Sequence, residues 1–479
     1  MPEIFINGHS VQAAANQSVL EAVRASGHFI PYFCWHPKLS VAGNCRICVV
    51  QVEGRSWVEI ACNMPVTEGL RIFTDSDLVK AHRKTVMQFM TLNHPVDCGI
   101  CDKAGECTLQ DYHYAFNGTP SVSREPKVRS TKFHDLSQRI LLDNERCILC
   151  SRCVRFTQEI SKSSGLGIKH RGDESLVRAS EDGAFDRDPY SDNVIDICPV
   201  GALLSRPFLY KARVWYLKPT ASVCPGCARG CTVNLWHRKP EWHLKALDPT
   251  QNFSIARVTP LENPAVNGPW ICNKGRDLAQ IFERPRAEQP MLKGRPVALQ
   301  EAIDAARRLI DAARHPVAVV STWGSNEELA AFSETLGGRF QSFFKEDWTP
   351  EPGERVEDDF LIRADKNPNT TAARALFAPL PDPVAFAADT DLVLIWGEGF
   401  DFARIPATAK IIFVNAYLQP ENGHADVFFS ASIQTERRGH YTNFEGVVSA
   451  FEACFPKKPG VADAETLFAA LAVEMAEKP

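Results

Sequence analysis

The N-terminal segment alternates apolar and polar side chains, and residues 1–13 read MPEIFINGHSVQA. A period of two is typical of half-buried strands, so the pattern predicts a strand pair. In the following SVLEAVRASG, Ser18 stands three residues before Glu21, which is the spacing of a capping box. The segment therefore predicts two strands followed by a helix that begins after Ser18.

The C-terminal part, from about residue 290, has a different pattern. The short apolar runs PVAVVSTWG, DLVLIWGEG and AKIIFVNAY each end in turn residues, and helical stretches such as ALQEAIDAARRLIDAA separate them. Apolar runs of this length are typical of buried parallel strands joined by crossover helices. We therefore predict an α/β layer domain.

Composition and charge narrow the class of protein. The chain has 479 residues, 44% hydrophobic and 23% charged, with a net charge of -5. This length suits several domains, and the charge lacks the basic excess typical of nucleic-acid binders, so no nucleic-acid partner is expected. There is no basic and apolar leader and no run of about 18 apolar residues, so we expect no export signal and no membrane helix. Membrane attachment is expected only through partner subunits.

Sixteen cysteines without a secretion signal indicate metal ligation rather than disulfides. They fall into groups of four, three, four and four, with Cys454 left over. The groups are Cys34, Cys45, Cys48 and Cys62; Cys98, Cys101 and Cys107; Cys147, Cys150, Cys153 and Cys198; Cys224, Cys227, Cys231 and Cys272.

The group of three begins with a histidine, in HPVDCGICDKAGEC at residues 94–107. Tetrahedral iron or zinc sites take four ligands, and an imidazole can replace a thiolate on iron. The spacing H-x3-C-x2-C-x5-C therefore predicts His94 as the fourth ligand. The alternative is a surface histidine before Pro95, with the fourth ligand supplied from elsewhere.

Spacing favours iron over zinc when the groups are taken together. The first group has gaps of 10, 2 and 13 residues, a 2Fe-2S ferredoxin arrangement, and Gly43 and Asn44 suit a loop that bends around cluster sulfides. The third group combines CILCSRC with a distant ICPVGAL, which is typical of one 4Fe-4S cluster. The fourth group, with gaps of 2, 3 and 40 residues, favours another 4Fe-4S cluster but leaves zinc open. Lys274 beside it is either a surface lysine or a residue near the cluster.

No catalytic centre is evident in the sequence. There is no P-loop and no G-x-G-x-x-G fingerprint, because GLGIKHRG misses the spacing and GEGFDF lacks the third glycine. No nucleophile and base stand together in a recognisable motif either. We therefore expect no NADH or flavin site and no catalytic residue in this chain, whose chemistry is electron conduction.

These motifs resemble a known family. HPVDCGICDKAGECTLQDY, RCILCSRCVRF, NVIDICPVGAL and the C-x2-C-x3-C run with WICNKGR follow the order found in the large iron-sulfur subunit, the G subunit, of bacterial respiratory complex I, NADH-quinone oxidoreductase. The resemblance covers nearly the whole chain and is most specific up to about residue 275.

The resemblance implies a ligand set and a cofactor for each group. It implies one 2Fe-2S cluster, three 4Fe-4S clusters and no other cofactor site. The implied ligands are Cys34, Cys45, Cys48 and Cys62 for 2Fe-2S; His94, Cys98, Cys101 and Cys107 for a 4Fe-4S centre; Cys147, Cys150, Cys153 and Cys198 for a second; Cys224, Cys227, Cys231 and Cys272 for a third, off-path one.

It also implies a multidomain α+β architecture. The last region looks like the molybdopterin oxidoreductase domain of this family, with SNEE at 325–328 and GHYTNFEGVV at 439–448. It is shorter than most, and no cysteine between Cys272 and Cys454 could ligate molybdenum, so we expect a structural remnant without molybdopterin. The expected modules are a β-grasp-like 2Fe-2S ferredoxin domain (1–78), a mixed histidine and cysteine 4Fe-4S module (79–118), a 4Fe-4S ferredoxin-like module (136–212), a 4Fe-4S module of molybdopterin-oxidoreductase type (217–275) and the shortened α/β domain (290–479).

The implied function is electron relay from an NADH/FMN flavoprotein subunit through the clusters toward quinone, coupled to proton translocation by other subunits. The implied partners are that flavoprotein, a 2Fe-2S thioredoxin-like subunit, a two-cluster ferredoxin-like subunit and other peripheral-arm subunits. The implied location is the cytoplasmic side of the bacterial inner membrane.

Two alternatives stay open at this point. The chain could be a relay subunit of a soluble NAD-linked hydrogenase or formate dehydrogenase complex, although a hydrogenase catalytic chain needs further cysteine motifs after residue 275 and a formate dehydrogenase needs a full pterin domain. It could also be a zinc-structured interaction protein, for which the 2Fe-2S spacing and the mixed histidine and cysteine group have no evident use.

Overall fold

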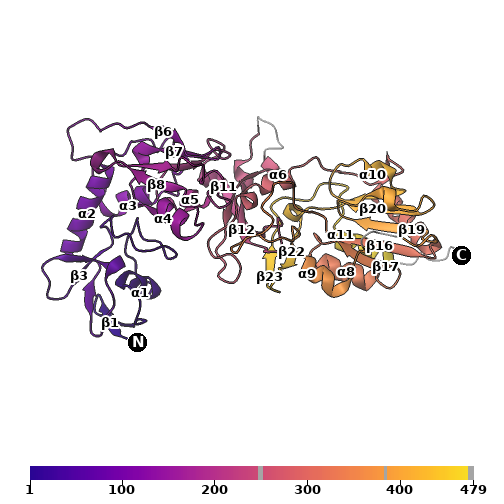
Figure 1. The fold of residues 1–479 in the computed structure, drawn as a ribbon, viewed down its shortest axis with the longest axis horizontal. Helices are drawn as coiled ribbons and strands as arrows, with labels where there is room; N and C mark the ends of the chain where they lie inside the picture. The colour runs from indigo at the N-terminus through magenta and orange to yellow at the C-terminus, as the bar shows by residue number, and fades with distance from the viewer. Residues whose placement is uncertain (246–251, 382–385, 473–479) are drawn as a thin grey trace. The chain divides into compact units, whose positions relative to one another are not determined.

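The structure is a computed structural model that describes residues 1–245, 252–381 and 386–472. The chain divides into two compact units, Met1–Tyr216 and Leu217–Pro479. Figure 1 shows the ribbon and labels many of its helices and strands. The first unit contains three of the cysteine groups and the second contains the fourth, so each unit is described by itself.

The first unit begins with a five-stranded sheet of order β2-β1-β5-β3-β4. Its strands are β1 (Glu3–Ile6), β2 (His9–Gln12), β3 (Val49–Val52), β4 (Val58–Ile60) and β5 (Arg71–Phe73). The predicted strand pair is present, since β1 and β2 pair antiparallel. Helix α1 (Val19–Ala25) follows, and both hydrogen bonds of the predicted capping box between Ser18 and Glu21 are formed, at 2.8 and 3.3 Å.

The rest of the first unit consists of short elements joined by long loops. A three-stranded sheet has the order β10-β7-β6, and β8 and β9 form a hairpin. The elements are α2 (Asp77–Leu92), α3 (Thr108–Phe116), β6 (Phe133–Asp135), β7 (Ile140–Asp143), α4 (Arg152–Glu159), β8 (Leu166–Lys169), β9 (Leu176–Ala179), α5 (Asn193–Ile197) and β10 (Leu203–Ser205).

The second unit begins with an antiparallel sheet of order β11-β12-β13, made of β11 (Leu217–Val223), β12 (Thr232–Arg238) and β13 (Ile255–Pro260), followed by α6 (Leu278–Phe282). A hairpin from later in the chain, β22 (Gly439–Thr442) and β23 (Val448–Phe451), packs on this part. Val223 joins Tyr441 and Phe451 in a small buried cluster there. The last strands of the chain therefore help to hold the segment that carries the fourth cysteine group.

An eight-stranded sheet dominates the second unit, in the order β15-β14-β21-β20-β19-β16-β17-β18. The six strands from β21 to β18 are parallel, and the three predicted apolar runs form β16, β19 and β20. The elements are β14 (Met291–Leu292), β15 (Arg295–Pro296), α7 (Leu299–Ala312), β16 (Pro316–Ser321), α8 (Asn326–Thr335), β17 (Gln341–Lys345), α9 (Thr370–Leu376), β18 (Ala378–Pro379), β19 (Leu392–Trp396), β20 (Lys410–Asn415), α10 (Glu421–His424), β21 (Val427–Ser430) and α11 (Ala464–Ala472). The predicted α/β layer domain is confirmed.

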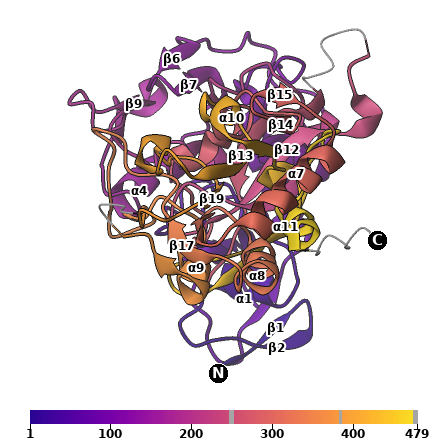
Figure 2. The ribbon, with the colours of Figure 1, turned by 90° about the vertical axis from the view of Figure 1, so that its right-hand side faces the viewer.

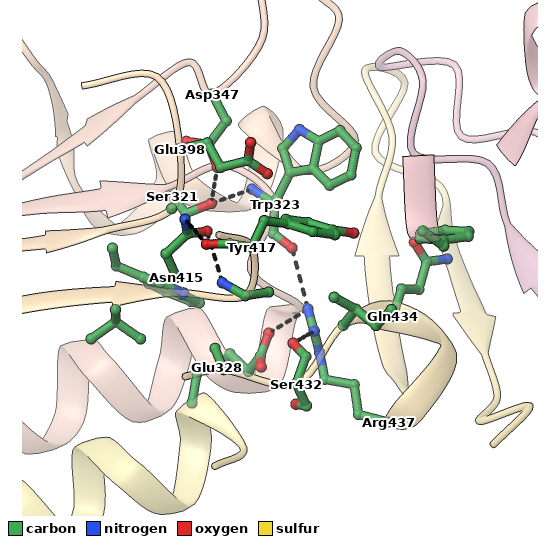
Figure 3. A pocket seen from close by; sticks show the side chains of 18 of the residues that line it. Ser321, Trp323, Glu328, Asp347, Glu398, Asn415, Tyr417, Ser432, Gln434 and Arg437 are labelled. Atoms are coloured by element: carbon green, nitrogen blue, oxygen red, sulfur yellow. Dashed lines mark hydrogen bonds and ion pairs between the residues drawn. The ribbon is translucent and has the colours of Figure 1, made fainter. Parts of the chain in front are cut away.

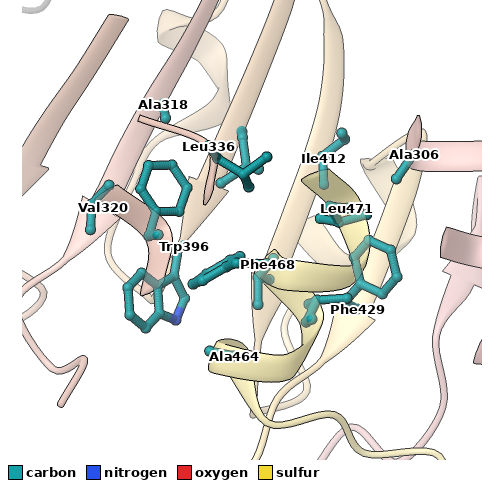
Figure 4. Packing of buried hydrophobic residues seen from close by; sticks show 14 of the residues in the cluster. Ala306, Ala318, Val320, Leu336, Trp396, Ile412, Phe429, Ala464, Phe468 and Leu471 are labelled. Carbon is teal, nitrogen blue, oxygen red and sulfur yellow. The ribbon is translucent and has the colours of Figure 1, made fainter. Parts of the chain in front are cut away.

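The core of this sheet is apolar and lies under α7, α8 and α11, and α11 packs against both other helices (Figure 2). Figure 4 shows Phe468 of α11 beside Trp396 of β19, with ring centroids 5.0 Å apart. Phe468 also meets Phe332 of α8 edge to face at 5.0 Å. These buried aromatic rings fix the helices on one face of the sheet.

Candidate iron-sulfur sites

The first cysteine group lies in the N-terminal sheet domain, and all four of its thiols are buried. Cys45 and Cys48 lie in the loop before β3, and Cys62 follows β4. Gly43 in this loop has a φ of 62°, a left-handed conformation that favours glycine, so the chain can turn sharply before Cys45. The loop and the sheet together bring four sequence-distant thiols into one place.

The four thiols of this group form two pairs. Cys34 Sγ and Cys45 Sγ lie 3.4 Å apart and share a hydrogen bond. That bond lowers the pKa of Cys34 to about 5, and the pKa of Cys45 is raised. Cys48 and Cys62 behave in the same way, since their hydrogen bond lowers the pKa of Cys62 and raises that of Cys48. Two sulfurs on one tetrahedral metal at about 2.3 Å lie about 3.8 Å apart, so each pair suits one iron of a two-iron cluster.

The mixed group of one histidine and three cysteines lies between α2 and α3. Cys107 directly precedes α3, at its N-cap position. Burial raises the pKa of Cys101, and the neighbouring Cys98 contributes to the rise. Burial and then the nearby Cys101 raise the pKa of Cys107 in turn. The three thiols are therefore neighbours, with Cys98 exposed and the other two buried.

His94 lies in the same charged environment as these thiols. Burial, followed by the positive charge of Arg146, lowers the pKa of His94 to about 4. Arg146 also lies close to Cys101, whose charge contributes to a raised pKa of the guanidinium. His94 is therefore a neutral imidazole at pH 7, which is the form that ligates a metal. Its identity as the fourth ligand remains a prediction.

The sequence of residues 123–134, SREPKVRSTKFH, is basic and contains a proline, which predicts a solvated linker. In the structure this stretch reaches into the site of the mixed group. Lys132 Nζ lies 2.5 Å from Asp97 Oδ2, and Arg146 Nη2 lies 2.9 Å from the same oxygen. Both cations also lower the pKa of His94. The stretch therefore supplies part of the charge around the mixed group.

The third group is built around the start of α4. Cys150 stands between Leu149 and Ser151, which have left-handed φ values of 52° and 59°. Cys147 precedes this turn and Cys153 lies in the first turn of the helix. The turn points successive cysteines toward one place at the cost of backbone strain.

Cys198, which follows α5, joins this group despite its distance in sequence. The pKa of Cys147 is raised to about 12, mainly by burial and further by the charges of the nearby Cys198 and Cys150. Burial and then Cys198 raises the pKa of Cys150 to about 11. Burial and all three other thiols raise the pKa of Cys153 further. The four thiols are therefore mutual neighbours, as the spacing predicts for a single cluster.

The loop after Cys198 connects the third group to the mixed group. Cys107 Sγ lies 4.0 Å from the carbonyl oxygen of Pro199. A Cβ at Gly201 would lie 2.2 Å from Cys101 Sγ, so only glycine allows this approach. The two groups are in direct contact through this loop.

The third group also contacts the first. Arg155 Nη2 donates to the carbonyl oxygens of Cys34, at 2.5 Å, and Cys150, at 3.3 Å. Asn44 Nδ2 donates to the carbonyl oxygen of Leu149 at 3.2 Å. The cysteine-bearing segments of the third group thus contact those of both other groups of the first unit.

The fourth group lies in the second unit, with three of its cysteines between β11 and β12 and Cys272 after β13. The amide of Cys224 donates to the carbonyl oxygen of Cys231 at 2.8 Å. Burial, then Cys272 and Cys227, raises the pKa of Cys224. Burial and then Cys227 raises the pKa of Cys272 to about 11. The distant Cys272 is therefore brought beside the other three.

Two lysines flank this group. Lys274, whose position the sequence left open, lies near Cys224, and its positive charge partly opposes the rise in the pKa of that thiol. Lys274 Nζ is 2.9 Å from Glu354 Oε1. Lys366 is 2% exposed, lies near Cys272 and is 3.4 Å from the same carboxylate. No motif in the sequence identifies Lys366, because it is distant from the cysteines along the chain.

The residues present fit iron-sulfur clusters. In the described ranges, no three His, Cys, Asp or Glu side chains converge as they do around a single metal ion. The thiols instead lie near one another in sets of four, or of three beside an imidazole, and four is the number of ligands that an iron-sulfur cluster takes. Nearly all of these thiols are partly or fully buried, which raises the cost of their charge and favours a bound cation.

Comparison with known families assigns each group to an iron-sulfur region. Residues 2–77 match the 2Fe-2S iron-sulfur cluster binding domain, and residues 83–120 match the NADH-ubiquinone oxidoreductase-G iron-sulfur binding region. Residues 137–204 match the ferredoxin-like domain of NADH-quinone oxidoreductase subunit 3, and residues 217–284 match the molybdopterin oxidoreductase Fe4S4 domain. The four matches contain the four cysteine groups in order.

Known proteins that align with 61% of this chain agree with these matches. The G subunit of NADH-quinone oxidoreductase from Rickettsia typhi is 36% identical over 293 residues, which cover 61% of this chain and 41% of that protein. The mitochondrial NADH dehydrogenase [ubiquinone] iron-sulfur protein 1 of Solanum tuberosum is 39% identical over 292 residues, 61% of this chain and 38% of that protein. Over these 292–293 residues the chain is homologous to the G subunit of NADH-quinone oxidoreductase.

The match to these relatives has a limited extent. The chain spans about two fifths of the length of the relatives named above, and the NADH-ubiquinone oxidoreductase 75 kDa subunit of Reclinomonas americana is covered to 40% at 36% identity. A crystal structure of NAD+-reducing [NiFe]-hydrogenase is 30% identical, with a TM-score of 0.39, over 44% of this chain and 91% of that one. No helix in the described part of the chain is long and apolar enough to cross a membrane.

The C-terminal sheet carries a small polar cavity. Figure 3 shows it at the carboxyl ends of β16 and β19, where the strand order reverses and where open α/β sheets bind ligands. Its volume is about 70 Å³, against about 300–1,000 Å³ for typical ligand pockets. The Ser321 hydroxyl donates to Asp347, and Arg437 pairs with Glu328 at 3.0 Å. These groups are therefore paired within the cavity.

A larger cavity, of about 740 Å³, lies near α6 in the same unit. Its cations are also paired within the chain. Arg286 makes a bidentate ion pair with Glu436, with both distances 2.9 Å, and Lys457 Nζ lies 2.6 Å from Asp463 Oδ2. The cations that line the two cavities are therefore paired with carboxylates of the chain and are not available to bind a phosphate.

Proposed function

We propose that the chain is an iron-sulfur electron-transfer subunit of respiratory complex I, relaying electrons from an NADH/FMN flavoprotein subunit toward quinone while other subunits translocate protons. The observation that carries the proposal is the gathering of fifteen cysteines into four groups, each inside a region that matches an iron-sulfur family. Three of these groups contact one another within one compact unit, as an electron relay needs.

The proposed cofactors are one 2Fe-2S and three 4Fe-4S clusters, which supply one-electron transfer when bound. The proposed 2Fe-2S ligands are Cys34, Cys45, Cys48 and Cys62; the 4Fe-4S ligands are His94, Cys98, Cys101 and Cys107; Cys147, Cys150, Cys153 and Cys198; and Cys224, Cys227, Cys231 and Cys272. The modules that hold them extend over residues 1–78, 79–118, 136–212 and 217–275, followed by the shortened α/β domain over 290–479.

The residues of the chain have three tasks in this function. They hold the thiols close enough to ligate, as the two thiol pairs of the first group illustrate. They keep neighbouring sites in contact, through Gly201 on one side of the third group and Arg155 on the other. They also bury the sites, which slows the access of oxidants and water to the thiols.

The remaining assignments follow from the family. We propose partners in the flavoprotein subunit, the 2Fe-2S thioredoxin-like subunit, the two-cluster ferredoxin-like subunit and other peripheral-arm subunits of complex I. The proposed location is the cytoplasmic side of the bacterial inner membrane, with attachment through those partners. We also propose that the shortened C-terminal domain binds no molybdopterin, since its switch-point cavity of about 70 Å³ is far too small for a pterin dinucleotide.

The test is low-temperature EPR of the anaerobically purified, dithionite-reduced chain, alongside His94→Cys and Cys272→Ser. We expect signals from one 2Fe-2S and three 4Fe-4S centres. His94→Cys alters one signal and Cys272→Ser removes another, and Cys454→Ser serves as the matched control that changes none. A chain that is EPR-silent, and stays so after reconstitution with iron and sulfide, contradicts the proposal and favours structural zinc.

A further inference from the structure

Two arginines of α4 lie buried between the first and third cysteine groups. Arg152 and Arg155 are each 8% exposed. Arg152 Nη2 donates to the carbonyl oxygen of Trp35, next to Cys34, at 2.6 Å, and its Nη1 donates to that of Ile197, next to Cys198, at 3.0 Å. We call these two residues the arginine pair.

Arg155 reaches the two groups even more directly. Its Nη2 donates to the carbonyl oxygens of Cys34 and Cys150, one predicted ligand of each group. Its Nη1 donates to the carbonyl oxygen of Ser40 and its Nε to the hydroxyl of Ser151. The same guanidinium therefore contacts a ligand residue of both sites.

The arginine pair has no negatively charged partner. Every acceptor found for it in the described residues is a carbonyl or a hydroxyl, and Arg152 Nε has no acceptor. Guanidinium groups stay protonated in proteins, and a buried charge without a counter-charge is costly. Thiolate-held clusters on both sides would supply the missing negative charge.

We propose that the arginine pair is a shared positive charge that raises the reduction potentials of both clusters, the one held by the first group and the one held by the third. The inference rests on the proposed function, because it requires those clusters. The arginines are positioning residues, since they act through the ligand-bearing backbone and through charge rather than by ligating iron.

The physical reason lies in the charge of the reduced state. Each reduction adds one electron and no proton to a cluster, so the reduced cluster carries one more negative charge. A fixed cation stabilises that state relative to the oxidised one. Because the arginine pair lies between the two groups, it raises the reduction potentials of both clusters. The difference between the two potentials therefore changes less than each potential does. A common shift leaves the difference between the two potentials nearly unchanged, and with it the driving force for electron transfer between the two clusters. It sets both potentials relative to those of the other clusters in the relay.

The experiment is a redox titration monitored by EPR on the full chain, with Arg155→Gln and Arg152→Gln as neutral variants. We expect each variant to weaken reduction of both clusters about tenfold, a shift of about 59 mV to lower potential for one electron. Arg155→Lys keeps the charge and should restore most of the wild-type values. The mixed group, which the arginine pair does not contact, serves as an internal reference with an unchanged midpoint.

A matched control loosens the same loop without removing a buried charge. Glu159, exposed on the next turn of α4, accepts hydrogen bonds from the amide and hydroxyl of Ser40 at 2.8 and 2.5 Å. Glu159→Gln weakens these contacts, and solvent screens its lost charge, so both midpoints should stay. A shift as large as that of Arg155→Gln would assign the effect to loop packing and overturn the inference.

The outcomes separate the inference from the function. Both clusters present with unchanged midpoints in the neutral variants overturn the inference and leave the proposed function standing. Absence of the clusters from the wild-type chain overturns the function. If Arg155→Gln does not load its clusters, Arg152→Gln decides, and unchanged midpoints there overturn the inference. If neither neutral variant binds its clusters, Arg155→Lys decides. Cluster binding in this variant, which keeps the positive charge, supports the inference, and failure to bind the clusters overturns it.

Discussion

The two units of the chain are held together in different ways. In the second unit, strands such as β16 and β19 are buried along their whole length, and aromatic rings from α8 and α11 fill the space above them. In the first unit, the N-terminal core includes the thiols of Cys48 and Cys62 among its apolar residues. The difference teaches that apolar packing alone forms the core of the α/β sheet, whereas in the first unit the candidate cluster ligands occupy part of the core.

Removal of iron gives the largest expected difference between the units. Structural metal sites contribute on the order of 10 kcal/mol to folding, so chelation under anaerobic conditions should expose the amides of residues 1–216. The amides of β16, β19 and β20 should keep their protection, because their contacts involve no cysteine. Hydrogen exchange followed by mass spectrometry measures both. Equal loss of protection in the two units would mean that both depend on iron to the same extent, contrary to this prediction.

Gly201→Ala should disrupt the contact between the third and mixed groups. The added Cβ meets Cys101 Sγ at 2.2 Å and the side chain of Lys103 at 3.2 Å. We expect the EPR signals of these two groups to weaken or disappear and the 2Fe-2S signal to remain. Gly167→Ala is the matched control, because nothing lies within 4 Å of its Cβ. Normal signals from Gly201→Ala would show that the loop adapts and that the close approach is not needed.

Phe468→Ala should affect only the second unit. The ring is fully buried between Trp396 and Phe332, and such truncations cost about 3–5 kcal/mol. Denaturant unfolding followed by circular dichroism should show this loss, while the EPR signals of the first unit stay unchanged. Leu376→Ala, at an exposed position of α9, should cost less than about 0.5 kcal/mol. An altered 2Fe-2S signal in Phe468→Ala would mean that the units are not independent.

Cys454→Ala should have the smallest effect. Burial raises the pKa of this thiol to about 12, so it stays neutral, and its hydrogen-bond partner is Thr220 rather than another cysteine. The iron content per chain should be unchanged, and stability should change by less than about 1 kcal/mol. Loss of iron on this substitution, measured by elemental analysis, would require a different ligand set for the fourth group.

Much of the fold could be predicted from the sequence because its signals are local. The alternation in residues 1–13, the capping pair Ser18 and Glu21, and the three apolar runs of the α/β domain each act over a few residues. The structure confirms all of them. The contacts of the basic stretch 123–134 could not be predicted in this way, because no local pattern indicates that Lys132 pairs with Asp97 beside the mixed group.

The candidate iron-sulfur sites also combine features that local sequence patterns predict with features that depend on distant residues. Cysteine spacing was enough to sort fifteen thiols into four groups, because ligands to one cluster come from tight loops plus one distant residue. The charged residues around them had no such signal. Arg152 and Arg155 stand within RCILCSRCVRF, yet their sequence neighbours do not reveal that they bind carbonyl groups of residues 34–40. Lys366 lies far along the chain from Cys272 and was missed for the same reason.

The sequence by itself determined which thiols belong together, where the parallel strands lie and which family the chain resembles, because spacing and periodicity are properties of neighbouring residues. Only the tertiary structure decided that the third group contacts both other groups of the first unit, that Gly201 must lack a Cβ and that two buried guanidinium groups lie between two sites. Contacts of this kind join residues about 100 positions apart, and they exist only when packing has fixed every intervening element.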